Sequence, residues 1–133
     1  MLKTAKRKSL KRGVINIEFS KRDIFNLNEP DESFDIVIAG NVLHLLDDPE
    51  KAVRELYRIT KCGGKILLPT FMTKNVGEFS KFVLKVYKKI GYSPCSEYSP
   101  KEYVDMLKNI GVGTVKHKLI RGLIPCCYAV ILK

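Results

Sequence analysis

The sequence lacks tryptophan and contains no long run of apolar residues. The longest aliphatic runs, residues 36–39 and 129–132, are far too short to cross a bilayer. The N-terminus is basic, but the apolar segment of a signal peptide does not follow it. We therefore expect no membrane partner and a cytoplasmic protein.

Metal-binding patterns are also missing. The four cysteines, Cys62, Cys95, Cys126 and Cys127, form no C-x-x-C pair. Neither of the two histidines, His44 and His117, has metal-ligand spacing to a cysteine. This pattern favours free thiols over a disulfide framework or a metal centre.

Charge is abundant and one-sided: the formal net charge is +10. Six basic residues lie within the first twelve positions, Lys3, Lys6, Arg7, Lys8, Lys11 and Arg12. Such a cluster fits a nucleic-acid contact or a solvated helix face. No aromatic residues interleave with it to stack bases, so we favour the solvated face and consider a nucleic-acid partner unlikely.

The hydrophobic periodicity predicts one α/β domain over residues 1–133. Short segments in which apolar and polar residues alternate, or in which apolar residues run without a break, predict strands. Apolar residues at helical spacing predict helices between these strands. Ser99-Pro-Lys-Glu102 is a capping box with proline at the first helical position. We expect helices at 2–12, 49–62, 76–90 and 99–111, and strands at 14–19, 34–39, 65–69, 115–120 and 128–132.

The order of these segments predicts a partial Rossmann-like, mostly parallel sheet with helices on both faces. Residues 121–125 connect the last two strands without a helix, so we expect a C-terminal antiparallel hairpin. In an open parallel sheet, ligands bind beyond the carboxyl ends of the strands. Asp23 and Gly40-Asn41 each follow a predicted strand and therefore belong to the candidate site.

Residues 33–68 carry a specific pattern. It contains Phe34-Asp-Ile-Val37, Leu43-His44, Arg54-Glu-Leu-Tyr-Arg58 and the turn Lys61-Cys-Gly-Gly64. This stretch resembles the class I S-adenosylmethionine-dependent methyltransferases of the small-molecule, quinone-biosynthesis type. The likeness extends over nearly the whole chain, and Cys62 departs from it where the family usually has proline.

The resemblance implies S-adenosyl-L-methionine as cofactor and a small-molecule methyl acceptor. Asp23 would accept a hydrogen bond from the adenine amino group, and the Ile24 amide would meet a ring nitrogen. Ala39, Gly40 and Asn41 would lie near the methionine part. His44 and Phe71 are weaker candidates for the acceptor side; packing in the core is the alternative for both, and for His44 we favour it. No residue is assigned as catalytic.

The family's glycine-rich cofactor turn is missing. Only Gly111-Val-Gly113 has the G-x-G spacing, and it follows a predicted helix instead of a strand. The chain therefore resembles the C-terminal portion of the domain, truncated before its third strand. Loss of three or four hydrogen bonds would weaken cofactor binding roughly a hundredfold to ten-thousandfold, so we expect weak or absent binding by this chain alone.

The missing strands would also leave the edge of strand 35–39 unpaired. Either the strand at 14–19 moves in beside it, or a second copy or another chain covers it. Three functions remain open at this point: a methyltransferase completed by a missing N-terminal half, a non-catalytic remnant or interaction module, and a basic nucleic-acid-binding module.

Overall fold

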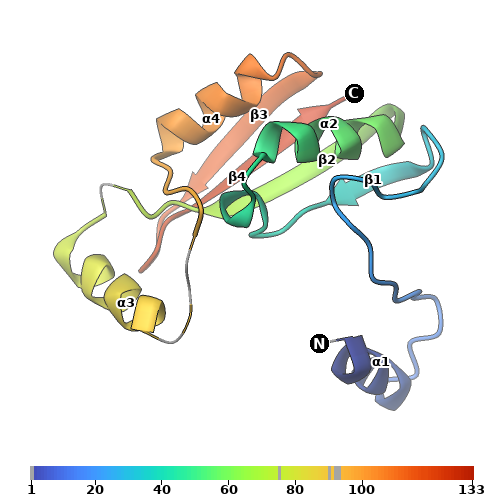
Figure 1. Cartoon of the computed structure of the whole chain (residues 1–133), viewed down its shortest axis with the longest axis horizontal. Coiled ribbons are helices and arrows are strands. Elements are labelled where there is room, and N and C mark those ends of the chain that lie inside the picture. Colours follow the sequence, from blue (N-terminus) through green and yellow to red (C-terminus); the bar gives the residue numbers. More distant parts are fainter. Residues whose placement is uncertain (1, 75, 90, 92–93) are drawn as a thin grey trace.

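The computed structural model describes residues 2–74, 76–89, 91 and 94–133. Figure 1 shows one mixed sheet with two helices packed on it, and two further helices set away from it. The elements in chain order are α1 (Leu2–Lys11), β1 (Phe34–Ile38), the 3₁₀ turn η1 (Leu43–Leu45), α2 (Pro49–Ile59), β2 (Thr60–Phe71), α3 (Glu78–Lys89), α4 (Pro100–Asn109), β3 (Thr114–Ile120) and β4 (Cys126–Leu132).

The sheet has the strand order β1-β2-β4-β3. β1 and β2 are parallel, with Val37 opposite Ile66, and they are joined through α2. β4 is antiparallel to β2, and β3 and β4 form the expected C-terminal antiparallel hairpin. The α/β class, the parallel pair and the closing hairpin are thus confirmed.

Helix starts follow from local chemistry. At α2, the Asp48 carboxylate accepts a hydrogen bond from the Lys51 amide at 2.9 Å, and Pro49 occupies the first turn. At α4, the capping box is complete: the Ser99 hydroxyl accepts from the Glu102 amide, and the Glu102 carboxylate accepts from the Ser99 amide. These start signals were predicted correctly from the sequence.

The core lies on one face of the sheet. Ile66 and Leu68 of β2 and Ala129 and Ile131 of β4 alternate toward this face and are buried. The apolar sides of α2 and α4 cover them through Ala52, Val53, Leu56, Tyr103 and Leu107. Figure 1 shows both helices on the same side of the sheet. The chain thus closes its core with two helices and one sheet face.

The opposite face of the sheet carries exposed apolar side chains, and we call it the open face. The strand register places Ile36, Ile38, Phe71, Ile120 and Tyr128 on it. Their exposed fractions range from 38% for Phe71 to 66% for Ile38. No described helix packs over these residues, so the expected cover of the second face is not provided by the described part of this chain.

The strand expected at residues 14–19 is wrong. This segment is irregular, and the Ile15 side chain is 93% exposed. In Figure 1, α1 and the segment after it lie apart from the sheet, and α1 buries none of its residues. An alternating pattern becomes a strand only when a neighbour completes its hydrogen bonds, and the described residues supply none.

The prediction that the strand at 14–19 would pair with the free edge of β1 is therefore also wrong. Among the described strands, β1 pairs only with β2, and residues 14–19 do not move in beside it. The other solution, a second copy or another chain at this edge, stays a prediction. β2 differs more mildly: it runs over Thr60–Phe71 and includes the Gly63-Gly64 stretch that we expected to be a turn.

Candidate functional site

The candidate site lies where β1 and β2 end. Because the two strands are parallel, the loop after Ile38 and the loop after Phe71 leave the sheet at the same end, which we call the carboxyl end. Residues 94–98 cross this end: the Ser96 amide donates to the His44 carbonyl at 3.1 Å, and the Lys74 amide donates to the Tyr98 carbonyl at 3.2 Å. Three loops therefore meet there.

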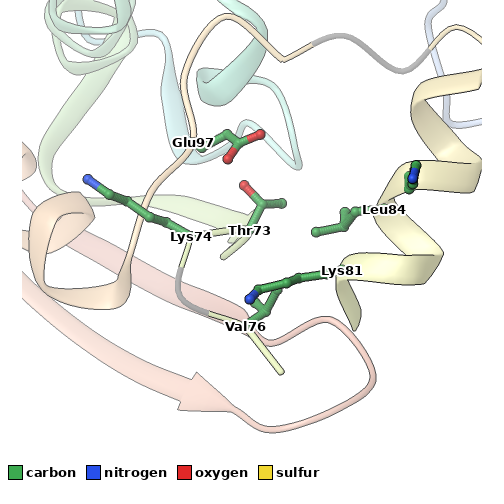
Figure 2. Close-up of a pocket in the computed structure, with 7 residues that line it drawn as sticks. Thr73, Lys74, Val76, Lys81, Leu84 and Glu97 are labelled. Atoms are coloured by element: carbon green, nitrogen blue, oxygen red, sulfur yellow. The ribbon is translucent and has the colours of Figure 1, made fainter. Parts of the chain in front are cut away.

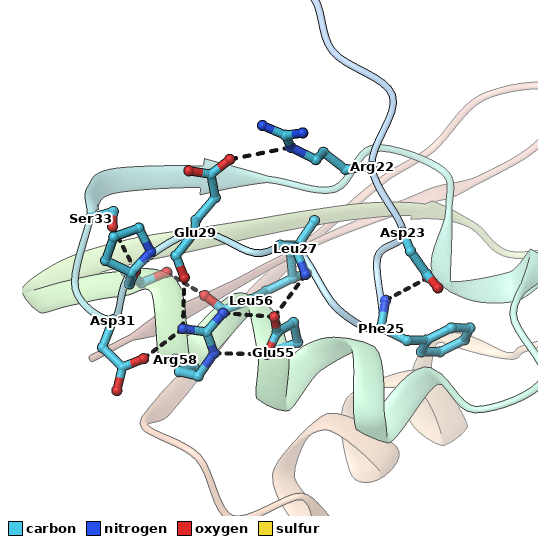
Figure 3. A network of polar contacts seen from close by, with 12 residues as sticks. Arg22, Asp23, Phe25, Leu27, Glu29, Asp31, Ser33, Glu55, Leu56 and Arg58 are labelled. Atoms are coloured by element: carbon cyan, nitrogen blue, oxygen red, sulfur yellow. Dashed lines mark hydrogen bonds and ion pairs between the residues drawn. The ribbon is translucent and has the colours of Figure 1, made fainter.

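A fourth segment, residues 23–33, is held along α2 (Figure 3). The Leu27 amide donates to the Glu55 carboxylate at 2.9 Å, and Arg58 donates to the Glu29 carbonyl at 2.8 Å. Near the other end of the segment, the Phe25 ring lies 5.6 Å from the Lys51 ammonium in the first turn of α2. α2 begins beside the carboxyl end, so this arrangement places Asp23 and Ile24 there.

The ion cluster around Arg58 fixes that segment. Arg58 donates to Glu55 at 2.7 and 2.8 Å and to Asp31 at 2.5 Å. The hydrogen bond from Arg58 lowers the pKa of Glu55 to about 2. In the sequence, Arg54-Glu-Leu-Tyr-Arg58 was noticed only as a family motif; the structure shows that Glu55 and Arg58 hold residues 27–31 against α2.

Asp23 and Ile24 offer a matched acceptor and donor. The Asp23 carboxylate accepts from the Phe25 amide at 3.0 Å through one oxygen, and its side chain is solvent-exposed. In the described part of the chain, the Ile24 amide donates no hydrogen bond. An acceptor next to a donor is the pattern that complements the amino group and ring nitrogen of adenine.

The end of β1 offers a second free group. In the parallel ladder, the Ala39 amide donates to the Leu67 carbonyl at 3.0 Å and the Asn41 amide to the Pro69 carbonyl at 2.8 Å. The residue that should donate to the Ala39 carbonyl between them is Pro69, which has no N–H. The Ala39 oxygen is thus left without its ladder donor at the carboxyl end, where it is suited to accept from a ligand ammonium.

The chain turns sharply after this point. Asn41 has a φ of 54°, in the left-handed region that only a few residue types adopt readily. The added Cβ of any residue at Gly40 would meet only the Pro69 side chain, at 3.8 Å. Gly40 therefore lies against open space, and Gly40 and Asn41 are exposed, whereas Ala39 is only 6% exposed. Contact of Asp23, Ile24 and residues 39–41 with one side of S-adenosylmethionine stays a prediction, and the glycine-rich turn that would hold the other side is not in this sequence.

His44 and Phe71, the two weaker candidates for the acceptor side, differ in exposure. His44 lies in η1 with only 3% of its surface exposed, and burial lowers the pKa of its imidazole, which favours the neutral form. This burial agrees with the packing role that we favoured for His44. Phe71 lies on the open face beside Cys126 and does not line the hollow described next. Contact of either residue with an acceptor stays a prediction.

A hollow of about 380 Å³ lies between the end of β2, residue Glu97 and α3. Its lining residues are Thr73, Lys74, Val76, Lys81, Leu84, Lys85 and Glu97 (Figure 2). Sequence reasoning missed Thr73 and Glu97, because they are 24 positions apart and only the path of residues 94–98 brings them together. No sequence motif marked either residue.

Fold and family agree. The family model described as "Methyltransferase domain" matches residues 1–68 of the chain, which is half of its length. The chain belongs to this methyltransferase domain family. The matched residues include Asp23, Ile24 and the segment 39–41.

Particular relatives extend the likeness. Residues of this chain are 34% identical over 79 positions to the ubiquinone/menaquinone biosynthesis C-methyltransferase UbiE of Bdellovibrio bacteriovorus, covering 59% of this chain and 33% of the relative. A malonyl-[acyl-carrier protein] O-methyltransferase of Paenibacillus is 26% identical over 121 residues, covering 86% of this chain and 44% of the relative. The chain thus spans less than half the length of both relatives.

A solved structure shows the same fold. The crystal structure of a SAM-dependent methyltransferase from Aquifex aeolicus matches with a TM-score of 0.69 and 21% identity. The match covers 98% of this chain and 63% of the Aquifex chain. This likeness supports the Rossmann-like architecture deduced from the strand order.

Proposed function

We propose that this chain forms one side of the cofactor site of an S-adenosylmethionine-dependent methyltransferase that acts on a small molecule. The observation that carries the proposal is the set of free polar groups at the carboxyl end of β1 and β2. These groups are the exposed Asp23 carboxylate, the adjacent Ile24 amide, which donates no hydrogen bond in the described residues, and the Ala39 carbonyl, which lacks its ladder donor. The family membership supports the same chemistry.

The roles of these residues follow from their groups. The Asp23 carboxylate and the Ile24 amide bind the adenine edge, and the Ala39 carbonyl accepts from the ammonium of the methionine part. The cofactor supplies a sulfonium-bound methyl group, which is already reactive toward a nucleophile. The protein therefore has to orient donor and acceptor and exclude water, and it needs few dedicated catalytic residues.

In this proposal the glycine-rich turn is supplied from outside these 133 residues, either by a longer form of the protein or by a separate chain. This additional polypeptide joins the unpaired edge of β1 and covers the open face. The support is the short span of the chain relative to its relatives, 33% and 44% of their lengths, together with the exposed Ile36 and Ile38. A homodimer through the same edge is the competing arrangement, and both bury the exposed apolar residues.

A fusion protein tests the proposal. The part of the Aquifex methyltransferase that this chain does not match is joined to residues 1–133, and S-adenosylmethionine binding is measured by calorimetry. We expect binding at least a hundredfold tighter than by the chain alone. Asp23→Asn in the fusion is expected to weaken binding roughly tenfold, the effect of one hydrogen bond to a charged group.

Asp105→Asn is the matched control for this substitution. Asp105 is also an exposed aspartate, but it lies on α4. The proposal predicts unchanged binding in this variant. Equal effects of the two substitutions, or a fusion that binds no better than the chain alone, would contradict the proposal.

A second function, a non-catalytic interaction module, is favoured by the open face itself. A folded fusion that binds no cofactor would support this module, provided that the isolated chain self-associates through residues of the open face. Transfer of a labelled methyl group by the fusion to any small acceptor would exclude it.

A further inference from the structure

Thr73 lies at the base of the hollow at the end of β2. The residue is only 8% exposed. Its hydroxyl makes no hydrogen bond in the described residues, and the hydroxyl oxygen itself is accessible to solvent. Its hydroxyl borders the hollow, on the side where Glu97 also lies (Figure 2). A hydroxyl that borders a hollow and has no protein partner is able to hydrogen-bond a water molecule or a ligand there.

The side walls combine apolar and cationic groups. Val76 and Leu84 provide the apolar surface, and Lys81 and Lys85 of α3 provide the charge. Lys81 also contacts Glu78 at 2.6 Å, but both side chains are exposed, at 58% and 90%. An exposed pair of this kind is weak, so Lys81 remains able to turn toward a ligand.

The charge in the hollow is not symmetric. Lys74 is paired with Glu102, and Figure 2 shows its ammonium pointing away from Thr73. The Glu97 carboxylate lies on the wall opposite α3 in the same view. An anionic group in the hollow is therefore attracted toward Lys81 and Lys85 and repelled from Glu97.

We propose that this hollow is the acceptor subsite and that it takes a small molecule whose apolar body carries a carboxylate or phosphate group. The anionic group lies toward Lys81 and Lys85, the body packs on Val76 and Leu84, and Thr73 hydrogen-bonds the ligand. Thr73 and Lys74 of the hollow follow directly after β2, so the hollow borders the same end of the sheet as residues 39–41. This assignment rests on the proposed methyltransferase function for its meaning as an acceptor subsite.

Titration of the ¹⁵N-labelled chain with benzoate, phenyl phosphate and phenol, without cofactor, tests the ligand class. We expect benzoate or phenyl phosphate to shift the amide signals of Thr73, Lys81 and Lys85, with phenol binding at least threefold more weakly. The stronger of the two anions identifies carboxylate or phosphate as the preferred group. Equal binding of phenol, equal shifts across the lysines of α1, or no binding by any probe would overturn the proposal.

Charge substitutions test the orientation. Lys81→Gln and Lys85→Gln are each expected to weaken binding of the anionic probe about two- to fivefold, the range of exposed ion pairs. Glu97→Gln is expected to strengthen it about twofold, because it removes a like charge. Lys89→Gln, on the same helix but outside the hollow, is the control and leaves affinity unchanged.

The sign of the Glu97 effect is decisive. A weaker affinity in Glu97→Gln, or an equal loss in Lys89→Gln and Lys81→Gln, would contradict the proposed orientation. Cofactor binding by the fusion protein is measured separately. Failure of the methyltransferase function and failure of the ligand class are thus distinguishable.

Discussion

At the residue scale, one arginine organises the loop that presents Asp23. Arg58 of α2 donates hydrogen bonds to the Glu29 carbonyl and the Asp31 carboxylate. Glu55 of the same helix accepts a hydrogen bond from the Leu27 amide. Glu55 is 14% exposed at its side chain, so its charge is stabilised mainly by these partners. Removing one partner would leave the other groups poorly satisfied.

The Glu55 carboxylate gives a pH-dependent prediction. Its pKa is about 2 in the folded protein, below its reference value of 4.5, so it stabilises the fold above pH 4.5. That contribution is lost as the pH falls from 4.5 toward 2. We expect Glu55→Gln to lower the free energy of unfolding by about 1–3 kcal/mol at neutral pH and to flatten its decline in acid.

Urea unfolding at several pH values measures both effects. Asp35→Asn is the matched control, because Asp35 pairs with Lys61 at 3.0 Å but has 82% of its side chain exposed. It should leave the free energy of unfolding nearly unchanged, because an exposed ion pair contributes little. A Glu55→Gln variant as stable as the parent, with the same acid dependence, would show that the cluster does not hold the loop.

Individual site residues were predictable to different degrees. Asp23, Ile24 and residues 39–41 follow from a local motif, and the structure gives each of them a place at the carboxyl end. The free Ala39 carbonyl requires the register of β1 against Pro69, which sequence alone does not provide. Thr73 and Glu97 meet only through tertiary structure, so no local pattern marks them.

At the element scale, strong local signals gave correct boundaries. Ser99-Pro-Lys-Glu102 predicted the start of α4, and Gly13, with a φ of 65°, follows α1 as expected. The segment 14–19 failed for a non-local reason. Its alternation is compatible with a strand, but strand formation depends on a neighbour elsewhere in the chain or in another chain.

The capping box gives an element-scale prediction. Ser99→Ala removes the hydroxyl that accepts from the Glu102 amide at 3.3 Å. We expect a loss of about 1 kcal/mol in the free energy of unfolding, because the first turn of α4 loses one satisfied donor. Thermal unfolding followed by circular dichroism measures it.

Ser20→Ala is a suitable comparison, since Ser20 is exposed, caps no helix start and makes no side-chain hydrogen bond in the described residues. An effect of Ser99→Ala no larger than that of Ser20→Ala would argue against a stabilising cap. Loss of all helical signal would indicate that α4 is needed for the whole core.

At the scale of the whole molecule, helices α2 and α4 cover one face of the sheet, and in the described residues no helix covers the other. Ile66 on the covered face is fully buried, whereas Ile38, on the open face, is 66% exposed. An exposed apolar patch of this kind usually binds another protein surface. The open face is therefore the surface that we expect another chain, or a segment outside these 133 residues, to cover.

Two substitutions distinguish the role of the covered face in stability from the role of the open face in association. Ile38→Ser should change the free energy of unfolding by about 0.5 kcal/mol or less and should reduce self-association of the isolated chain in analytical ultracentrifugation. Ile66→Ala should cost about 2–5 kcal/mol and leave the association surface intact. Unchanged association in Ile38→Ser would exclude the open face as the contact surface.

A chemical-shift map of the ¹⁵N-labelled chain with S-adenosylhomocysteine tests the proposed cofactor site directly. We expect millimolar or weaker binding, with the largest shifts at Asp23, Ile24 and residues 39–41. Binding tighter than 100 micromolar, or shifts centred on other residues, would contradict the claim that this chain holds one side of the cofactor site.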